Sequence, residues 1–291
     1  MSSAQVYLDG HFLPLAEARV SVEDRGFLFG DGVYEVLRAS AGRLYEEEAH
    51  WRRLASSCRE VALTHPEGLS EEDLRALALE LLARNGLGEG EATVYLQLTR
   101  GAAPRTHHFP PPGTRPTLYL SAAAFAPPWE ARTRGVQAIT LPDVRWSRCN
   151  IKSLNLLPNT LAKQRAREAG AAEAVFVRDG VLTEGASTTV FAVLDGALVT
   201  HPNGPHILPG VTRDVVLALA RAAGIPLHER PLRLEEREHF DELFVASTTL
   251  DLAPVVALDG QPVGAGRPGP VTRALQQAFY AAQGVTPPPL G

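Results

Sequence analysis

Hydrophobic and polar residues alternate along several short stretches of the chain, whereas along others the hydrophobic residues recur every three to four positions. The first pattern predicts β-strands and the second predicts amphipathic helices. In the first half of the chain, strands are predicted at residues 33–39, 92–100 and 116–124. In the second half, they are predicted at residues 135–141, 174–178, 181–183, 189–193 and 243–246.

Five segments have the spacing of a helix. In residues 47–63, Trp51, Leu54 and Cys58 share one face, and arginines lie on the other. A second helix begins after Ser70, which three acidic residues follow, and ends at an Asn-Gly pair. The remaining helices are expected at residues 161–169, from residue 208 onward, and at residues 271–282.

Residues 24–45 combine an apolar stretch with three glycines, at positions 26, 30 and 32. This density of glycine argues against a helix there. Neither GxGxxG nor GxxxxGK is present, so a phosphate-binding loop is not expected either. We expect a tight backbone that delivers Tyr34 from a strand into a pocket. Earlier in the chain, an Asp-Gly turn joins two short strands, residues 5–8 and 11–13.

A length of 291 residues suits two domains better than a single core. Two adjacent prolines stiffen residues 124–130, and we place the boundary there. The prediction is a smaller N-terminal α/β domain of residues 1–123, a linker of residues 124–130, and a larger cofactor-binding domain of residues 131–291.

Composition argues against several classes of function. The chain has 28 basic and 33 acidic residues, and no basic block suggests a nucleic-acid or membrane-surface partner. No segment reaches the roughly 20 apolar residues of a membrane span, and the N-terminus does not resemble a signal peptide. Two cysteines form no disulfide framework, and the loop histidines His108, His201 and His206 lack the spacing of a metal site. We expect a cytoplasmic protein without metal.

Lysine is rare in this chain, because only Lys152 and Lys163 occur among the 28 basic residues. An amine, unlike a guanidinium, can lose its proton and attack a carbonyl carbon. A free lysine has a pKa of about 10.4, so this use requires burial or nearby positive charge, which Arg145 and Arg148 could supply. Lys163 falls on a predicted helix and is expected to be a surface charge. Composition alone leaves Lys152 equally open to two readings, a nucleophile and an ordinary surface lysine.

Three further features of the second half suit one cofactor. Glu184 ends a predicted strand. Val211 and Thr212 open a helix, whose N-terminus can bind phosphate, and a Ser-Thr-Thr turn occupies residues 247–249. With the Lys152 amine, these features suit an aldehyde, a basic ring nitrogen and a phosphate, which pyridoxal phosphate combines. Each feature alone is weak evidence.

The loop at residues 101–113 is too rich in proline and glycine for regular structure, yet it carries Arg105 and His107. Charged loop residues on a rigid scaffold are frequent binding elements. From the residues alone, a solvated turn is slightly favoured over a binding loop.

Six segments of the chain follow one another as they do in a known enzyme family. They are DRGFLFGDGVYEV, QLTRGAAPRTHHFP, DVRWSRCNIKSLNLL followed by LAKQ, LTEGAST, GVTRDVV and ELFVASTT. Together they run from residue 24 to about residue 249. In these segments the chain resembles the class IV (fold-type IV) pyridoxal-phosphate aminotransferases, and within them the bacterial D-amino acid aminotransferases. The resemblance implies a two-domain α+β fold, transaminase activity and pyridoxal phosphate as the cofactor.

The resemblance also implies a role for each candidate site residue. Lys152 is the catalytic residue, which links covalently to the cofactor and moves a proton at the substrate α-carbon. Glu184 contacts the pyridine nitrogen. Thr189 stands where many members carry asparagine; because threonine can still hydrogen-bond, we expect the pocket to survive. The other implied cofactor-binding residues are Arg53, Arg145, Val211, Thr212, Ser247 and Thr248.

For the substrate, the resemblance implies that Arg105, His107 and Tyr34 trap the α-carboxylate. An arginine binds a carboxylate with two parallel hydrogen bonds. Holding the carboxylate on one side of the pocket selects the enantiomer whose α-hydrogen points toward Lys152. Arg105 and His107 are implied to reach into the active site of the other subunit, so a homodimer is expected.

The expected reaction transfers the amino group of D-alanine to 2-oxoglutarate, giving pyruvate and D-glutamate. Two alternatives share the fold: a branched-chain L-amino acid aminotransferase and an aminodeoxychorismate lyase. Arg105 and His107 argue against both. A third alternative, a non-catalytic pyridoxal-phosphate-binding protein, has no chemical need for Lys152, Glu184 and Arg53 together.

Overall fold

The computed structural model of the protein describes residues 4–64 and 69–287. Within them, antiparallel strands occur in runs along the chain, with helices between the runs, as in an α+β fold. Contacts divide the chain into two compact units, Met1–Ala126 with Ile151–Asn155 and Pro127–Asn150 with Leu156–Gly291.

The segment Ile151–Asn155 belongs to the first unit because its backbone bonds to strand β3 (Gly32–Ser40). The Tyr34 N–H donates to the carbonyl of Lys152 over 3.0 Å, and the Leu154 N–H donates to the carbonyl of Gly32 over 3.0 Å. The sequence pattern instead assigns the whole of residues 131–291 to the second domain. Backbone pairing between residues more than 100 positions apart leaves no trace in the local sequence pattern.

The first unit contains a six-stranded sheet whose neighbouring strands all run antiparallel. Besides β3, its strands are β1 (Gln5–Leu8), β2 (His11–Pro14), β4 (Arg43–Leu44), β5 (Glu91–Thr99) and β6 (Thr117–Ala124). They follow the order β2-β1-β6-β5-β3-β4 across the sheet. The predicted Asp-Gly hairpin and the three long strands predicted in this half are confirmed.

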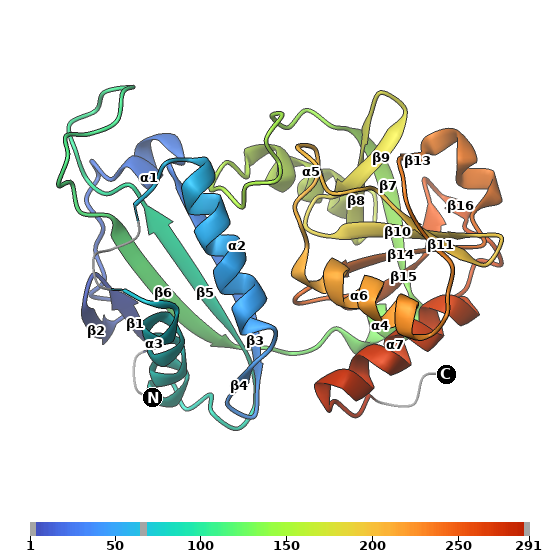
Figure 1. Ribbon diagram of the computed structural model, residues 1–291, viewed down its shortest axis with the longest axis horizontal. Coiled ribbons are helices and arrows are strands. Elements are labelled where there is room, and N and C mark those ends of the chain that lie inside the picture. The colour runs from blue at the N-terminus through green and yellow to red at the C-terminus, as the bar shows by residue number, and fades with distance from the viewer. Residues whose placement is uncertain (1–3, 65–68, 288–291) are drawn as a thin grey trace. The chain divides into compact units, whose positions relative to one another are not determined.

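Helices α2 (Glu47–Glu60) and α3 (Glu71–Arg84) pack against this sheet and share one apolar core with it (Figure 1). Every second residue of β5 is buried in that core: Ala92, Val94, Leu96 and Leu98. The predicted start of α3 is confirmed, because the Ser70 hydroxyl accepts the Asp73 N–H while the Asp73 carboxylate accepts the Ser70 N–H. The alternation of apolar and polar residues in β5 therefore corresponds to a sheet with one face covered by helices.

A short helix, α1 (Arg25–Phe29), occupies the glycine-rich segment, so the prediction against a helix there was wrong. The Asp24 side chain accepts the Gly26 N–H at the start of α1, and Gly30 ends the helix with a φ of 67°. A Cβ at position 26 would lie 2.3 Å from the Thr99 side chain. Glycine is needed at position 26 for close packing against β5, and at position 30 to end the helix.

The second unit contains a ten-stranded mixed sheet. Its strands are β7 (Val136–Pro142), β8 (Glu173–Arg178), β9 (Val181–Gly185), β10 (Thr189–Leu194), β11 (Ala197–Thr200), β12 (Leu227–Glu229), β13 (Leu232–Arg233), β14 (Glu242–Ser247), β15 (Asp251–Leu258) and β16 (Gln261–Pro262). Nine of them follow the order β12-β11-β10-β14-β15-β7-β8-β9-β13, and β16 pairs with β15. The pairs β7/β8, β7/β15 and β11/β12 are parallel.

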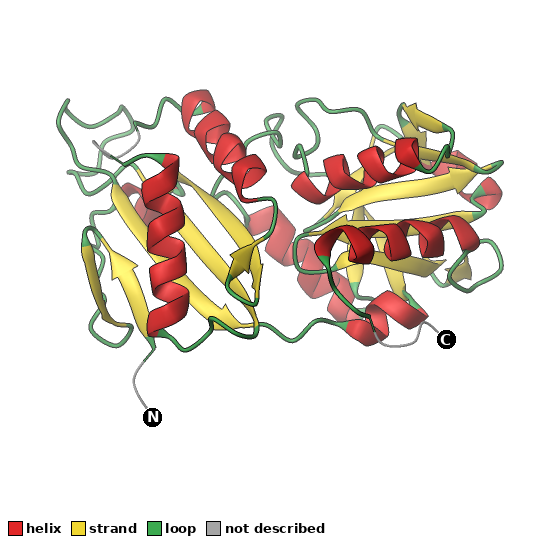
Figure 2. Ribbon diagram, turned by 60° about the horizontal axis from the view of Figure 1, so that its bottom comes forward, coloured by secondary structure: helices red, strands yellow, loops and turns green. Residues whose placement is uncertain are grey.

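Helices pack against the strands of this unit as well (Figure 2). Its helices are α4 (Trp129–Arg134), α5 (Leu157–Glu168), α6 (Val211–Ala222), the 3-10 helix η1 (Leu234–His239) and α7 (Pro270–Gln283). The helices α6 and α7 share an apolar core with β10, β11 and β14, and α5 forms a smaller core with β7 and β8. The three long helices predicted in this half are confirmed.

Seven elements of the second unit were not predicted: β11, β12, β13, β15, β16, α4 and η1. Strand β15 contains Pro254, and an interior proline argues against a strand because it donates no N–H to the ladder. Pro254 lies opposite Phe244 of β14, and the parallel pairing with β7 begins only at the next residue, Val255. The strand therefore tolerates a proline at position 254. Helix α4 begins inside the predicted linker of residues 124–130.

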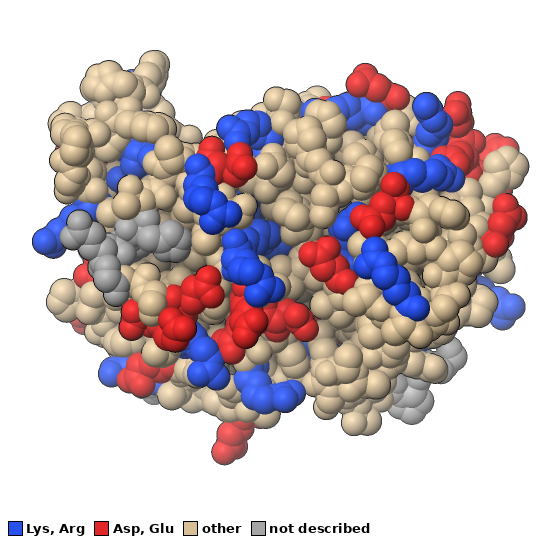
Figure 3. All heavy atoms as spheres, viewed as in Figure 1, with Lys and Arg blue, Asp and Glu red and all other residues tan. Residues whose placement is uncertain are grey.

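Acidic and basic side chains are interspersed on the face of the molecule drawn in Figure 3. The formal net charge is −5. Among the described residues, no helix is both long enough and apolar enough to cross a bilayer.

Candidate active site

Lys152 is held at its backbone by two elements of the first unit. Its carbonyl accepts the Tyr34 N–H of β3, and its own N–H donates to the Ser57 hydroxyl of α2 over 3.2 Å. The Lys152 Nζ lies 4.2 Å from the centre of the Tyr34 ring. The structure therefore brings together the predicted nucleophile and one predicted substrate-binding residue.

Arg53, on α2, lies in a buried ionic cluster with Glu35 and His50. Strand β3 turns Tyr34 to one face of the sheet and Glu35 to the other, toward α2. The Arg53 Nε donates to Glu35 Oε1 over 2.7 Å, and Nη2 donates to Oε2 over 2.8 Å. The His50 Nδ1 lies 2.8 Å from Oε2, and it must carry a proton there because an ionised carboxylate only accepts. These contacts fix the orientation of the Arg53 guanidinium.

The protonation states of this cluster follow from burial and charge. Burial alone would raise the pKa of Glu35, but the charge and hydrogen bonds of Arg53, with those of His50, outweigh it and lower the pKa to about 2. Burial also lowers the pKa of His50 below its ordinary value, against the opposing effect of Glu35. The cluster is thus an ionised carboxylate, a guanidinium and a neutral imidazole near neutral pH.

Arg105 and His107 are exposed and lie against the same aromatic ring of α1. The Arg105 guanidinium carbon is 5.1 Å from the centre of the Phe29 ring. The His107 and Phe29 rings meet edge to face, with their centres 5.8 Å apart. The loop that carries these two residues is therefore ordered on a helix of its own unit.

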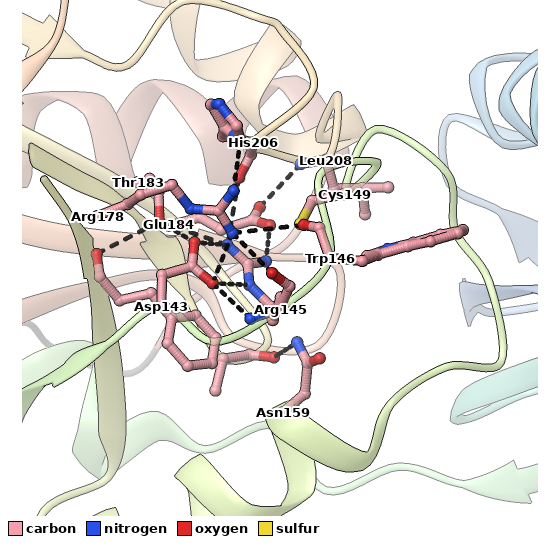
Figure 4. A network of polar contacts seen from close by, with 12 residues as sticks. Asp143, Arg145, Trp146, Cys149, Asn159, Arg178, Thr183, Glu184, His206 and Leu208 are labelled. Carbon is pink, nitrogen blue, oxygen red and sulfur yellow. Dashed lines mark hydrogen bonds and ion pairs between the residues drawn. The ribbon is translucent and has the colours of Figure 1, made fainter.

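Glu184 is the last residue but one of β9 in the second unit, and its side chain is buried. Arg145 Nη1 donates to Oε1, and the Leu208 N–H donates to Oε2 over 3.0 Å. Burial raises the pKa of Glu184 to about 7, although the Arg145 charge acts in the opposite direction. Figure 4 shows this pair at the centre of a wider polar network.

The same guanidinium is shared with a second carboxylate, Asp143. Arg145 Nε and Nη2 donate to the two oxygens of Asp143, each over 2.9 Å, and the Thr183 hydroxyl donates to Asp143 over 3.1 Å. Arg178 Nη2 lies 3.3 Å from Asp143 and also donates to the Arg145 carbonyl over 2.9 Å. Burial would raise the pKa of Asp143, but Arg145 and Arg178 lower it below its ordinary value. Arg145 is thereby fixed in place by contacts other than Glu184.

Two long helices of the second unit begin differently. Glu242 accepts the N–H groups of Val271 and Thr272 at the start of α7, each over 2.8 Å. At the start of α6, no acceptor is recorded among the described residues for the N–H groups of Val211 and Thr212. The start of α6 therefore has backbone donors available for an anion.

Thr189, at the position where the family pattern has asparagine, lies beside that helix start. A Cβ at position 210 would come 2.8 Å from the Thr189 hydroxyl, so Gly210 allows the close approach. Thr189 is buried.

Ser247 ends β14, and Thr248 begins the turn that leads to β15. The Ser247 hydroxyl accepts the Leu250 N–H over 3.2 Å. Arg132, fully buried on α4, donates to the Thr249 carbonyl over 3.2 Å and pairs with Asp251 over 2.9 Å. The turn is fixed by a charged side chain that the sequence offered no reason to single out.

Sequence reasoning missed Glu35, Asp143 and Arg132, all of which orient other predicted residues. Glu35 could have been found from the sequence. It is the one carboxylate in the predicted strand of residues 33–39, and strand alternation turns it to the face opposite Tyr34, toward the core. Arg132 had no comparable sign, since its partners lie in and next to β15, whereas Asp143 stands only two residues before its partner Arg145. Lys163 is a half-exposed helix residue, as predicted, and its Nζ donates to the Ala172 carbonyl over 2.7 Å.

Comparison with solved structures defines the class of protein. The branched-chain amino acid aminotransferase of Escherichia coli matches with a TM-score of 0.87 and 27% identity, over 96% of this chain and 94% of that one. The branched-chain aminotransferase of the archaeon Thermoproteus uzoniensis matches with a TM-score of 0.84 and 25% identity, over 97% and 96% of the two chains. A third branched-chain amino acid aminotransferase, solved with pyridoxamine 5'-phosphate, matches with a TM-score of 0.85 and 25% identity, over 99% and 96% of the two chains. The fold is that of a fold-type IV aminotransferase, as predicted.

Sequence comparison then gives the family. The family described as "Amino-transferase class IV" matches residues 32–258. The D-alanine aminotransferase of Staphylococcus haemolyticus is 42% identical over 275 residues, which cover 94% of this chain and 96% of that protein. The D-alanine aminotransferase of Bacillus licheniformis is 40% identical, with 94% and 95% covered. The chain belongs to the class IV aminotransferase family, and it is a pyridoxal-phosphate-dependent transaminase.

Proposed function

We propose that this transaminase exchanges the amino group between a D-amino acid and a 2-oxo acid, with D-alanine and 2-oxoglutarate as the main pair. The observation that carries the proposal is the joint presentation of Arg105 and His107 on Phe29. Two donors held against one ring suit one carboxylate. Relatives that are 39–42% identical act on D-alanine by name, whereas the structural neighbours named for branched-chain substrates are only 25–27% identical.

The second unit fits the ring and phosphate of the cofactor. When bound, pyridoxal phosphate supplies an electron-accepting ring conjugated to an aldehyde carbon. The available N–H groups of Val211 and Thr212 suit a phosphate, and Ser247 and Thr248 add hydroxyl donors. Glu184 is buried, so it suits the protonated ring nitrogen, and Arg145 orients the Glu184 carboxylate.

In the first unit, Lys152 and Arg53 complete the set of cofactor-binding residues. Lys152 would hold the cofactor through its amine and would move the proton at the substrate α-carbon. Arg53 gives its remaining donor capacity to the phosphate, because Glu35 already fixes its orientation. Tyr34 joins Arg105 and His107 in binding the carboxylate.

In this proposal the enzyme works as a homodimer in the cytoplasm. Arg105 and His107 are exposed on their own chain, which supports the idea that they serve the active site of the partner subunit. Cys58 and Cys149 are both free and buried, which suits a reducing compartment.

The test is a parallel assay of the purified holoenzyme with D-alanine, with L-valine and with aminodeoxychorismate, using 2-oxoglutarate as acceptor for the two amino acids. We expect D-alanine to be consumed and pyruvate to form. Lys152→Ala should abolish turnover, whereas Lys163→Ala, which changes the only other lysine, should keep it. Consumption of L-valine alone would overturn the substrate proposal, and turnover by Lys152→Ala at the parent rate would overturn the role of Lys152.

A further inference from the structure

Helix α1 contacts the centre of the loop that carries Arg105 and His107. The Arg25 side chain is only 3% exposed, and its Nη1 donates to the carbonyl of Thr106 over 2.8 Å. Thr106 is the residue between Arg105 and His107. Arg25 Nε donates to Asp31 over 2.8 Å, so the guanidinium bridges a carboxylate of the scaffold and the backbone of the loop.

Phe29, one turn further along α1, contacts the two side chains that flank Thr106. Its ring centre lies 5.1 Å from the Arg105 guanidinium carbon and 5.8 Å from the centre of the His107 ring. The guanidinium carbon of Arg25 lies 4.8 Å from the same ring centre. One aromatic ring therefore limits where Arg105 and His107 can move relative to each other.

The start of the loop is tied to the same region by backbone bonds. The Arg25 N–H donates to the Gly101 carbonyl over 2.9 Å, and the Ala103 N–H donates to the Glu23 carbonyl over 3.3 Å. Beyond Thr106, the Arg100 guanidinium carbon lies 3.8 Å from the centre of the Phe109 ring. The loop is thus tied before, at and after the pair Arg105 and His107.

The local charge also suits an anion. Asp31 accepts hydrogen bonds from both Arg25 and Arg100, so one carboxylate serves two guanidinium groups. Arg105 adds a third positive charge next to Arg25 and Arg100. Its guanidinium lies against the Phe29 ring. A carboxylate arriving at Arg105 and His107 therefore meets an excess of positive charge.

We propose that Arg25 and Phe29 are positioning residues for carboxylate recognition, which hold Arg105 and His107 at the spacing that one substrate carboxylate requires. The inference rests on the proposed function, because it takes Arg105 and His107 as the carboxylate-binding pair. It adds that their spacing is set by α1 rather than by the loop alone.

The test compares Arg25→Lys and Phe29→Leu with wild-type holoenzyme, using propionate as an unreactive carboxylate. Lysine keeps the charge but lacks the fork that reaches Asp31 and Thr106 together. Leucine keeps an apolar side chain but removes the ring. From the loss of one hydrogen bond or ring contact, we expect the propionate Kd to rise roughly fivefold to tenfold in each variant. The KM for D-alanine should rise by a similar factor, with kcat within about twofold of wild type.

The matched control is Arg19→Lys, because the Arg19 side chain is exposed and donates only to the carbonyls of Ala16 and Ala18. Cofactor content and melting temperature should be equal in all four proteins, which separates positioning from general loss of structure. Equal propionate Kd values in Arg25→Lys, Phe29→Leu and Arg19→Lys would overturn the inference. So would unchanged propionate binding by Arg105→Leu, since the carboxylate would then bind elsewhere.

Failure of the proposed function gives a different result. If wild-type enzyme consumes L-valine and not D-alanine, the substrate proposal fails. The propionate comparison still decides the role of Arg25 and Phe29 in that case, because it does not depend on which enantiomer reacts.

Discussion

Two buried glutamates, Glu35 in the first unit and Glu184 in the second, each face an arginine, yet their pKa values move in opposite directions. The pKa of Glu35 falls to about 2, and that of Glu184 rises to about 7. Burial opposes ionisation in both cases. The difference must therefore lie in how each arginine is used.

Arg53 and His50 direct three hydrogen bonds at Glu35, so both carboxylate oxygens face positive charge or a donor. Arg145 instead gives two of its N–H groups to Asp143 and only Nη1 to Glu184. The Asp143 charge further raises the pKa of Glu184. Because Arg145 is shared with Asp143, it does not offset the effect of burial on the pKa of Glu184.

The two arrangements suit different tasks. Glu35 has most of its acceptor capacity in use, which makes it an anchor for Arg53. Glu184 accepts from one guanidinium N–H and one backbone N–H, so it retains capacity for a further donor such as a ring N–H. A carboxylate poised near neutral pH can respond to that donor by ionising.

The largest difference is expected in activity. Glu184→Gln removes the charge that would hold a proton on the ring nitrogen, and kcat should fall roughly 100- to 1000-fold at saturating cofactor. Glu35→Gln, the matched change, should leave kcat within about tenfold and act mainly on cofactor affinity. Steady-state kinetics with D-alanine distinguish the two. Similar losses of kcat in both variants would mean that the two glutamates do not have separate tasks.

For the free energy of unfolding, Glu35→Gln should have the larger effect and Glu184→Gln the smaller one. Glu35→Gln leaves the buried Arg53 without its charge partner, which costs about 3–5 kcal/mol of unfolding free energy. Glu184→Gln leaves Arg145 paired with Asp143, and the cost should stay below about 1 kcal/mol. Urea denaturation of the apoproteins at pH 7 gives both values. A larger loss in Glu184→Gln would contradict the account of how Arg145 is shared.

A smaller effect is expected from Arg145→Lys. A lysine ammonium is a point charge, so it cannot donate hydrogen bonds to Asp143 and Glu184 at the same time, as the planar guanidinium does. We expect kcat to fall about tenfold, with unchanged KM for D-alanine. Arg134→Lys, on the exposed face of α4, is the control and should have no effect. A rise in KM without a fall in kcat would show that Arg145 acts on the substrate instead.

The smallest effect is on the pH dependence of stability, and it has opposite signs for the two residues. The pKa of Glu35 lies below its ordinary value of 4.5, so its stabilisation is present above pH 4.5 and is lost as pH falls toward about 2. The pKa of Glu184 lies above 4.5, so its contribution is complete below pH 4.5 and is lost as pH rises through about 7. The measurement is the melting temperature of each apoprotein as a function of pH. Compared with wild type, the curve of Glu184→Gln should differ in slope above pH 4.5, and that of Glu35→Gln should differ in slope below pH 4.5.

Much of the fold could be predicted because one buried face imposes a period on the sequence. Strand β5 is the clearest case, since Ala92, Val94, Leu96 and Leu98 all face the helices. The same reasoning did not predict β15, which contains Pro254, and it failed for α1, where glycines needed for packing suggested the absence of a helix. Both failures arise where a tertiary neighbour, not local propensity, decides the backbone.

The candidate site divides in the same way. The rarity of lysine made Lys152 a candidate but left it equally open to a surface role, and the resemblance assigned roles to Lys152 and Glu184. Glu35 and Asp143 were not found, because their importance lies in contacts made only after folding: Glu35 pairs with Arg53, 18 positions along the chain, and Asp143 acts on Glu184 through Arg145. Family segments suggest which residues to assign to the cofactor, whereas physical contacts identify the residues that orient those candidates.

The return of Ile151–Asn155 to the first unit has a consequence for biosynthesis. The carbonyl of Gly32 and the N–H of Tyr34 acquire their partners from a segment that the ribosome adds more than 100 residues later. A nascent chain that ends before this segment can form the six-stranded sheet but lacks the lysine and its backbone ties. Folding of the first unit therefore ends only after synthesis of the second has begun. Residues 1–126 alone therefore lack Lys152 and the rest of the segment that completes the first unit.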